Sequence, residues 1–225
     1  MSFIIDTNTY TYLGQKIMGK HLQSIDNKVI NRIYGHGKGW VFTVAHFFDL
    51  GGRDAVASAL KRYLRSGIIR QLARGLYDYP RIDPELGILT PSTDAVARAL
   101  AGRDAVRLQP SGAYAANLLG LSTQVPMKII YLTDGRSHTV KIGKKEIVLK
   151  RTTPLNMATA GRISGLVIQA LRYLGQRHVD EDLVSALDSR LDADSRRQLL
   201  KDVRFAPVWI AEIMRGLGKK EETAL

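Results

Sequence analysis

The stretch that decides the fold runs from Trp40 to Tyr79 and reads WVFTVAHFFDLGGRDAVASALKRYLRSGIIRQLARGLYDY. Its first part predicts a short strand at 40–42, followed by a short helix at 43–50. Thr43 stands where its hydroxyl can cap that helix. The two glycines at 51–52 then give the backbone the freedom to turn into a second helix. Two helices separated by a tight turn are therefore expected here.

The second helix, predicted at 53–66, is amphipathic. Its apolar residues recur at three- and four-residue spacings and form one stripe, made of Val56, Ala59, Leu60, Tyr63 and Leu64. The other side carries small and basic residues, namely Arg53, Ala57, Ser58, Lys61, Arg62 and Arg65. A helix that buries the stripe presents a face that suits a DNA major groove, because small residues permit close approach while long ones reach bases and phosphates.

A β-hairpin is predicted beyond Gly67, which ends the second helix. Its strands are apolar segments at 68–72 and 76–79, and Arg74 lies in the turn between them, where it can reach a minor groove or a phosphate. With a further helix predicted at 22–34, the order of elements is that of a winged helix-turn-helix, a DNA-reading module. A second interpretation stays open, in which the basic face is only solvated and the module binds another protein.

Composition favours a polyanionic partner. The chain has 225 residues, of which 45% are hydrophobic, so it can bury a sizeable core. The formal net charge is +12, and residues 1–80 hold 11 Lys and Arg against 5 Asp and Glu. Residues 151–225 hold 12 against 10, so the excess falls mainly on the proposed DNA module. Double-stranded DNA is the polyanion that this module would bind.

Several classes of protein are excluded or disfavoured. There is no cysteine, which excludes disulfides, thiolate metal sites and cysteine nucleophiles. No apolar run approaches the roughly 20 residues that span a bilayer. The N-terminus lacks the basic-then-apolar pattern of a signal peptide. A cytoplasmic protein without a membrane partner is therefore expected.

The whole chain is predicted to be an α+β protein. The winged helix-turn-helix would be followed by a larger domain with a small antiparallel sheet and a C-terminal helical bundle. The expected boundaries are a poorly patterned N-terminal arm at 1–21, the DNA-binding module at 22–80, a linker rich in proline and glycine at 81–91, the α+β domain at 92–217 and a charged tail at 218–225.

The sequence offers no persuasive active site, so no enzyme, cofactor or metal site is expected. No two of the five histidines have the i,i+4 spacing of a helical metal site. Ser111 has no evident base beside it and is expected to cap a helix. The acidic run from Asp180 to Asp182 suits a helix start. The lysine-rich hairpin at 139–151 is interpreted as a protected edge strand, with a second phosphate-contacting surface as the alternative.

Two stretches resemble the AbiEi-like antitoxins of bacterial type IV toxin–antitoxin systems. The first is LARGLY, at 72–77, which closes the winged helix. The second is QPSGAYAANLLGL, at 109–121, followed by Val125-Pro126 and the strand at 129–133. A similar order and spacing of motifs would cover roughly residues 25–215. Each motif is weak alone, and their order makes the pair more specific.

That resemblance implies a cytoplasmic antitoxin of an abortive-infection system that represses its own operon by binding inverted repeats in promoter DNA. It also implies that the C-terminal domain counteracts a co-encoded nucleotidyltransferase-like toxin, directly or indirectly. The expected state is a monomer in solution, with cooperative binding on DNA left open. The expected DNA-binding residues are Thr43, Arg53, Ser58, Lys61, Arg62, Arg65 and Arg74. The alternatives are a protein-interaction module and a general transcriptional regulator without a toxin.

Overall fold

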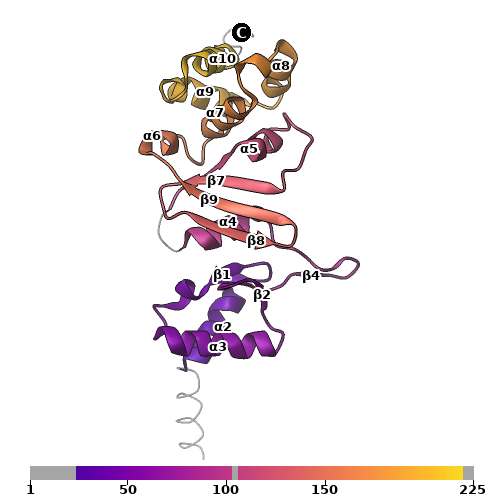
Figure 1. Cartoon of the computed structure of the whole chain (residues 1–225), viewed down its shortest axis with the longest axis vertical. Helices are drawn as coiled ribbons and strands as arrows, with labels where there is room; N and C mark the ends of the chain where they lie inside the picture. The colour runs from indigo at the N-terminus through magenta and orange to yellow at the C-terminus, as the bar shows by residue number, and fades with distance from the viewer. Residues whose placement is uncertain (1–23, 103–105, 220–225) are drawn as a thin grey trace, which may run out of the picture. The chain divides into compact units, whose positions relative to one another are not determined.

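The computed structural model describes residues 24–102 and 106–219 and divides the chain into two compact units. Unit 1 ends at Ala95 and unit 2 begins at Val96, within helix α4 (Thr93–Ala101). The mixed α+β class is confirmed, with small sheets and a series of C-terminal helices (Figure 1). The predicted arm at 1–21 and the end of the predicted tail, at 220–225, lie outside the described residues.

Unit 1 has the predicted order of elements up to the hairpin. Its elements are α2 (Ile25–His36), β1 (Val41–Thr43), the 3-10 helix η1 (Val44–Phe47), α3 (Arg53–Arg65), β2 (Arg70–Ala73) and β3 (Leu76–Asp78). β3 lies between β1 and β2 and pairs antiparallel with both. The core beneath the sheet is formed by buried residues of the two helices, η1 and the sheet: Val29, Ile33, Phe42, Phe47, Val56, Ala59, Leu60 and Ile69.

The helix predicted at 43–50 is wrong in length, because only the four residues of η1 are helical. Arg32 of α2 donates a hydrogen bond of 2.6 Å to the carbonyl oxygen of His46. The backbone amide of Leu50 bonds to the oxygen of Phe47 instead, at 2.9 Å. The guanidinium of Arg32 also donates hydrogen bonds to both carboxylate oxygens of Asp49, at 2.7 and 2.6 Å. A tertiary contact from another helix therefore ends η1, and the local sequence does not contain that information.

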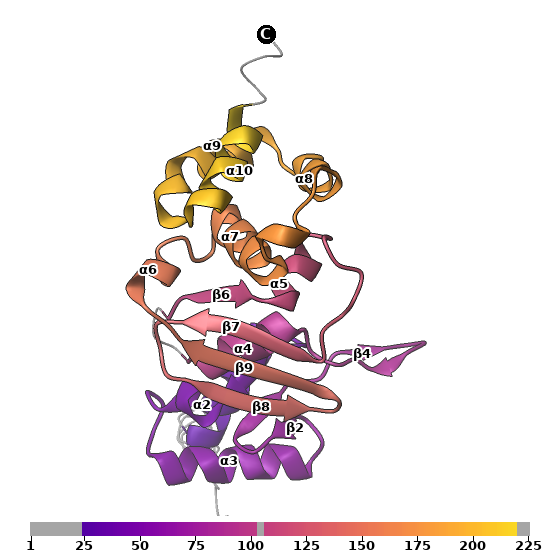
Figure 2. The same ribbon diagram turned by 45° about the horizontal axis from the view of Figure 1, so that its top comes forward.

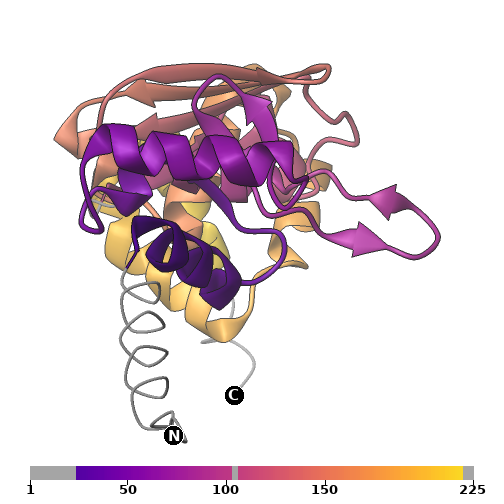
Figure 3. The same cartoon turned by 90° about the horizontal axis from the view of Figure 1, so that it is seen from below.

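The segment predicted as a linker at 81–91 contains a β-hairpin. Strands β4 (Ile82–Asp83) and β5 (Gly87–Ile88) pair antiparallel and form a sheet of their own. The hairpin extends from the rest of unit 1 (Figure 3). Asp83 shapes its tip, because its carboxylate accepts hydrogen bonds from the backbone amides of Glu85 and Leu86, at 2.9 and 3.0 Å. Those two bonds, that from Leu86 first, lower the pKa of Asp83 below its ordinary value.

Unit 2 is built on a four-stranded sheet in the order β6-β7-β9-β8 (Figure 2). Its strands are β6 (Leu108–Ser111), β7 (Lys128–Thr133), β8 (His138–Ile142) and β9 (Lys145–Arg151). The sequence predicts an antiparallel sheet, whereas the central pair β7–β9 is parallel. Burial explains this order. Ile147 and Leu149 make β9 apolar and central, whereas β8 has no buried residue and occupies the edge.

The helices of unit 2 form its main core. They are α5 (Ala113–Leu118), α6 (Pro154–Met157), α7 (Ile163–Leu174), α8 (Glu181–Asp188), α9 (Ala193–Asp202) and α10 (Val208–Lys219), with short 3-10 turns η2 (Gln176–His178) and η3 (Val203–Phe205). Val167 and Leu171 of α7 pack with Leu187, Leu199 and Met214 from the helices that follow. In the part of the chain that the structure covers, no helix has the length and apolar character needed to cross a membrane.

The caps of these helices test individual sequence predictions. Asp180 accepts a hydrogen bond from the amide of Leu183 at 2.9 Å, which confirms it as the start of α8. Asp192 caps α9 by accepting a hydrogen bond from the amide of Ser195, at 2.8 Å. The prediction for Ser111 is wrong. It is the last residue of β6, and its hydroxyl donates to Oε1 of Gln169 at 3.1 Å instead of capping α5.

Candidate nucleic-acid interface

Helix α3 buries one side and exposes a face that contains most of the predicted DNA-binding residues. Val56, Ala59 and Leu60 are at most 1% exposed. The exposed residues of the helix are Arg53, Asp54, Ala55, Ala57, Ser58, Lys61, Arg62 and Arg65. The periodicity of the sequence therefore predicts the two sides of this helix correctly, because burial follows the 3.6-residue repeat.

Two contacts fix α3 against α2. The guanidinium of Arg62 forms an ion pair with Asp26. The hydroxyl of Tyr63 donates to the backbone oxygen of Asp26 at 2.9 Å. Burial, ahead of the nearby Asp26 charge, raises the pKa of Tyr63 above its ordinary value. The orientation of the basic face is thus set by contacts on the helix's inner and flanking sides.

Three cations of α3 remain available to a ligand. Arg53, Lys61 and Arg65 are exposed, and within the described residues none of them has an ion-pair or hydrogen-bonding side-chain partner. They occur at the start, middle and end of the 13-residue helix. At a rise of about 1.5 Å per residue, such a row extends over roughly 18 Å, which is long enough to follow several phosphates of a groove.

Two of the predicted contact residues are already engaged within unit 1. Arg62 is the ion-pair partner of Asp26, although its side chain is 55% exposed. Thr43 is half-buried at the junction of β1 and η1. Its backbone amide donates to Nδ1 of His46 at 3.1 Å, and its hydroxyl oxygen lies 3.1 Å from the same nitrogen. The structure therefore gives Thr43 and Arg62 roles in holding the helices in place.

Arg74 lies in the two-residue loop between β2 and β3. Ala73 and Leu76 pair across the end of the hairpin, so Arg74 and Gly75 alone make the turn. Gly75 has φ +76°, a left-handed conformation that suits glycine. Arg74 is exposed, and no ion-pair partner for it occurs among the described residues. The predicted position of this cation at a hairpin tip is correct.

Asp54 is a member of the exposed face that the sequence reasoning did not consider. It occupies the second position of α3 and is exposed, between the basic residues Arg53 and Lys61 of the same face. An acid in the first turn is stabilised by the helix dipole, which is a sufficient structural reason for it. A carboxylate at this position can also accept a hydrogen bond from a cytosine amino group, whereas it would repel a phosphate.

The lysine-rich hairpin of unit 2 is a second basic surface. Lys141, Lys144, Lys145, Lys150 and Arg151 are all exposed. Lys128 of the neighbouring strand β7 instead pairs with Glu146, at 3.5 Å. β8, which contains Lys141, is an edge strand of the sheet, whereas Lys145, Lys150 and Arg151 belong to β9, which is not.

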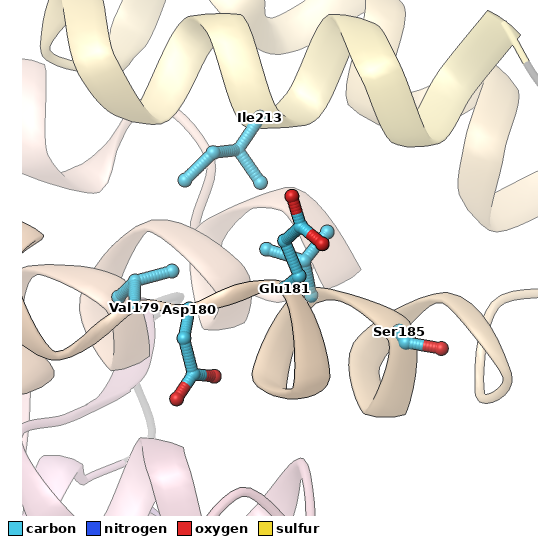
Figure 4. Close-up of a pocket in the computed structure, with 6 residues that line it drawn as sticks. Val179, Asp180, Glu181, Ser185 and Ile213 are labelled. Atoms are coloured by element: carbon cyan, nitrogen blue, oxygen red, sulfur yellow. The ribbon is translucent and has the colours of Figure 1, made fainter.

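A groove of about 430 Å³ lies between α10 and the start of α8. Figure 4 shows Ile213 of α10 facing it, with Val179 and Glu181 opposite. The side chain of Asp180 points away from Ile213 and caps α8. Neither His nor Lys lines the groove, and its two carboxylates, those of Asp180 and Glu181, belong to the start of α8. In the described part of the chain, no group of three or more His, Asp or Glu side chains could hold a metal ion.

Comparison with known proteins identifies a family. No curated protein matches the chain significantly. A family model described as a family of unknown function, DUF6088, matches residues 28–199, which are 172 of the 225 residues. The match covers the elements from α2 into α9 and hence the whole basic face of α3. Because it spans more than half of the chain, this protein belongs to the DUF6088 family of unknown function.

Proposed function

We propose that this protein is a DNA-binding repressor whose unit 1 acts as a winged helix-turn-helix. The observation that carries the proposal is the exposed face of α3, where Arg53, Lys61 and Arg65 have no ion-pair partner among the described residues. In the proposed complex α3 enters the major groove and Arg74 of the β2–β3 hairpin contacts the adjacent backbone or minor groove. Ser58, small and exposed, permits close approach and donates to a base or phosphate.

We further propose that the protein is the cytoplasmic antitoxin of a type IV toxin–antitoxin system, which autoregulates its operon. This part is supported by the resemblance carried by the LARGLY and QPSGAYAANLLGL stretches and by the net charge of +12. Unit 2 would counteract a co-encoded nucleotidyltransferase-like toxin. The proposal assigns no catalytic residue and no cofactor to this chain.

DNA binding is tested by fluorescence-anisotropy titration with the protein's own promoter DNA over a range of salt concentrations. Each phosphate that is neutralised contributes about −0.9 to the slope of log K against log salt concentration. Lys61→Ala, Arg65→Ala and Arg74→Ala should each weaken binding and flatten that slope. Lys201→Ala, which removes an exposed lysine from α9, is the matched control and should bind as the wild type does. Unchanged affinity in all three variants would refute the proposal.

The antitoxin part has a separate test. If the neighbouring reading frame encodes a nucleotidyltransferase, its expression alone should arrest growth, and co-expression of this chain should restore it. Separate expression of the two from unrelated promoters distinguishes neutralisation from repression of the operon. DNA binding without any growth rescue would instead favour the alternative, a transcriptional regulator that has no toxin partner.

A further inference from the structure

Asp54 differs from the other acids of residues 24–80, because its carboxylate has no partner within the described residues. This part of the chain contains four acids, and three of them form ion pairs with arginines: Asp26 with Arg62, Asp49 with Arg32 and Asp78 with Arg70. Asp54 is exposed, and neither an ion pair nor a hydrogen bond to its side chain occurs among the described residues. Its carboxylate is therefore available to a ligand.

Asp54 also lies on the line of α3 that is farthest from the core. An outer stripe of the helix is formed by residues at successive spacings of four, three and four, namely Asp54, Ser58, Lys61 and Arg65, and all of them are exposed. At about 3.6 residues per turn, the centre of this stripe lies about 180° around the helix from the centre of the buried stripe. A groove that receives α3 would meet the side chains of the outer stripe first.

The outer stripe changes in chemistry along the helix. Asp54 and Ser58 occupy its first half, whereas the cations Lys61 and Arg65 occupy its second half. In helix-turn-helix proteins, the N-terminal residues of the recognition helix contact base edges. Lysine and arginine are the common partners of phosphates. Position along α3 therefore favours base contact for Asp54 and backbone contact for Lys61 and Arg65.

A carboxylate that faces base edges discriminates between them. An ionised carboxylate accepts hydrogen bonds and donates none. In the major groove guanine presents the acceptors N7 and O6, thymine presents the acceptor O4, and adenine presents the acceptor N7 beside its amino group. Cytosine presents the donor N4 amino group and no acceptor of its own. Cytosine is therefore the base that a carboxylate in this position would select.

We infer that Asp54 is a specificity-determining residue, which accepts a hydrogen bond from the N4 amino group of one cytosine in the DNA site. The inference rests on the proposed binding of DNA by α3 and adds the identity of one base pair to it. An acid in the first turn also offsets the helix dipole, but any exposed position of that turn would serve this purpose. The dipole does not require a carboxylate on the outer stripe, where it repels the phosphates of every sequence.

The test begins with selection of binding sites by the full wild-type chain from random duplex DNA. Anisotropy titrations then compare the selected duplex with duplexes in which each base pair is changed in turn. Asp54→Ala should lose most of the wild type's preference at one C·G pair, which we expect to be about tenfold. It should also bind unselected duplex DNA more tightly than the wild type, because one repulsive charge is removed. Asp54→Asn should prefer A·T at the same pair, since asparagine pairs with N6 and N7 of adenine.

Asp182→Ala is the matched control. Asp182 is likewise an exposed acid at the second position of a helix, α8, and its replacement changes the net charge by the same one unit. This variant should keep the wild type's preference at every base pair. Circular dichroism checks that each variant folds, and Asp54→Asn preserves the shape of the side chain if Asp54→Ala alters the helix.

Two results would overturn the inference and leave the proposed repressor standing. In the first, both Asp54 variants keep the wild type's base preferences and their affinity changes equally on every duplex, so that Asp54 only offsets the helix dipole. In the second, the preference is lost at an A·T pair and not at a C·G pair. A wild type that selects no duplex would refute the repressor and the inference together, and that result is seen before any variant is compared.

Discussion

Arg70 and Asp78 face each other across the β2–β3 hairpin and form a two-point ion pair in which the carboxylate is buried. Nε and an Nη of Arg70 donate to the two carboxylate oxygens of Asp78, at 3.1 and 2.6 Å. The side chain of Asp78 is only 1% exposed. The same Nη also donates to the backbone oxygen of Leu89 at 3.1 Å, which ties the base of the β4–β5 hairpin to the sheet. The bond to Asp78, opposed by burial, raises the pKa of Arg70 above its ordinary value.

Arg70→Met should lower the free energy of unfolding by about 3 kcal/mol, because it leaves the Asp78 carboxylate buried without its counter-charge. The double variant Arg70→Met, Asp78→Leu should recover much of that loss. Urea unfolding can be followed through Trp40 in a Trp209→Phe background, since Trp40 and Trp209 are the two tryptophans of the chain and belong to different units. If Arg70→Met alone were as stable as the wild type, the role assigned to this ion pair would be contradicted.

The helices and the β2–β3 hairpin of unit 1 could be predicted because their signals are local. The apolar spacing in α3 and the Arg74-Gly75 turn are properties of short stretches, and both are found close to their predicted positions. The length of η1 could not be predicted in this way, because Arg32 ends it from a different helix. The β4–β5 hairpin was missed for another reason. Pro84 and Gly87 indicate a turn and give no indication of whether paired strands flank it.

The candidate site shows the same division. Exposure of Arg53, Lys61 and Arg65 follows from helical periodicity, which the sequence contains. The pairing of Arg62 with Asp26 joins residues 36 positions apart, and no local pattern predicts which exposed arginine will find an acid. Likewise, the parallel pairing of β7 with β9 could be predicted only by comparing the burial of strands across the whole sheet.

Arg62→Ala should weaken DNA binding less than Lys61→Ala or Arg65→Ala. The reason is that Arg62 forms an ion pair with Asp26 and must give up that partner to contact a phosphate. Because the pair is partly exposed, its loss should also change the free energy of unfolding by less than about 1 kcal/mol. Anisotropy titrations of the three variants at one salt concentration provide the comparison. If Arg62→Ala were the weakest binder of the three, the ion pair would not be limiting the availability of Arg62.

Substitution of Arg53 or Ser58 should mainly relax sequence preference, since residues near the start of a recognition helix contact base edges. The expected loss of discrimination for Arg53→Ala is about 1–3 kcal/mol at the affected base pair, with smaller effects on non-specific DNA. Selection of binding sites from a random pool by the wild type and each variant measures this directly. If the substitutions weakened binding equally on every DNA sequence, Arg53 and Ser58 would contact phosphates and not base edges.

The Arg107–Asp134 pair predicts a pH dependence for unit 2. Nε of Arg107 donates to Asp134 at 2.8 Å, and the backbone amide of Arg107 donates at 2.9 Å. The side-chain bond first, then the backbone bond, lowers the pKa of Asp134 below its ordinary value. A depressed carboxyl pKa contributes stability that is present above the unfolded value, about 4, and is lost as pH falls through the folded value.

Asp134→Asn should therefore melt below the wild type at pH 7, and the difference should shrink as the solution is acidified below about pH 4. Thermal melts of both proteins across that range provide the measurement. A difference that grew on acidification would have the wrong sign for a depressed carboxyl pKa.

Two glycines of the C-terminal helices should respond to alanine in opposite ways. A Cβ at Gly165, in α7, would overlap the backbone oxygen of Thr159 and Oε1 of Gln109. The backbone oxygen cannot move aside as a flexible side chain can, so Gly165→Ala should cost about 1–3 kcal/mol. At Gly216, in α10, a Cβ would meet no atom within 4 Å, so Gly216→Ala should stabilise the helix by about 0.5–1 kcal/mol. Urea unfolding of both variants through Trp209 in a Trp40→Phe background tests the pair, and a neutral Gly165→Ala would show that α7 can shift away from its neighbours.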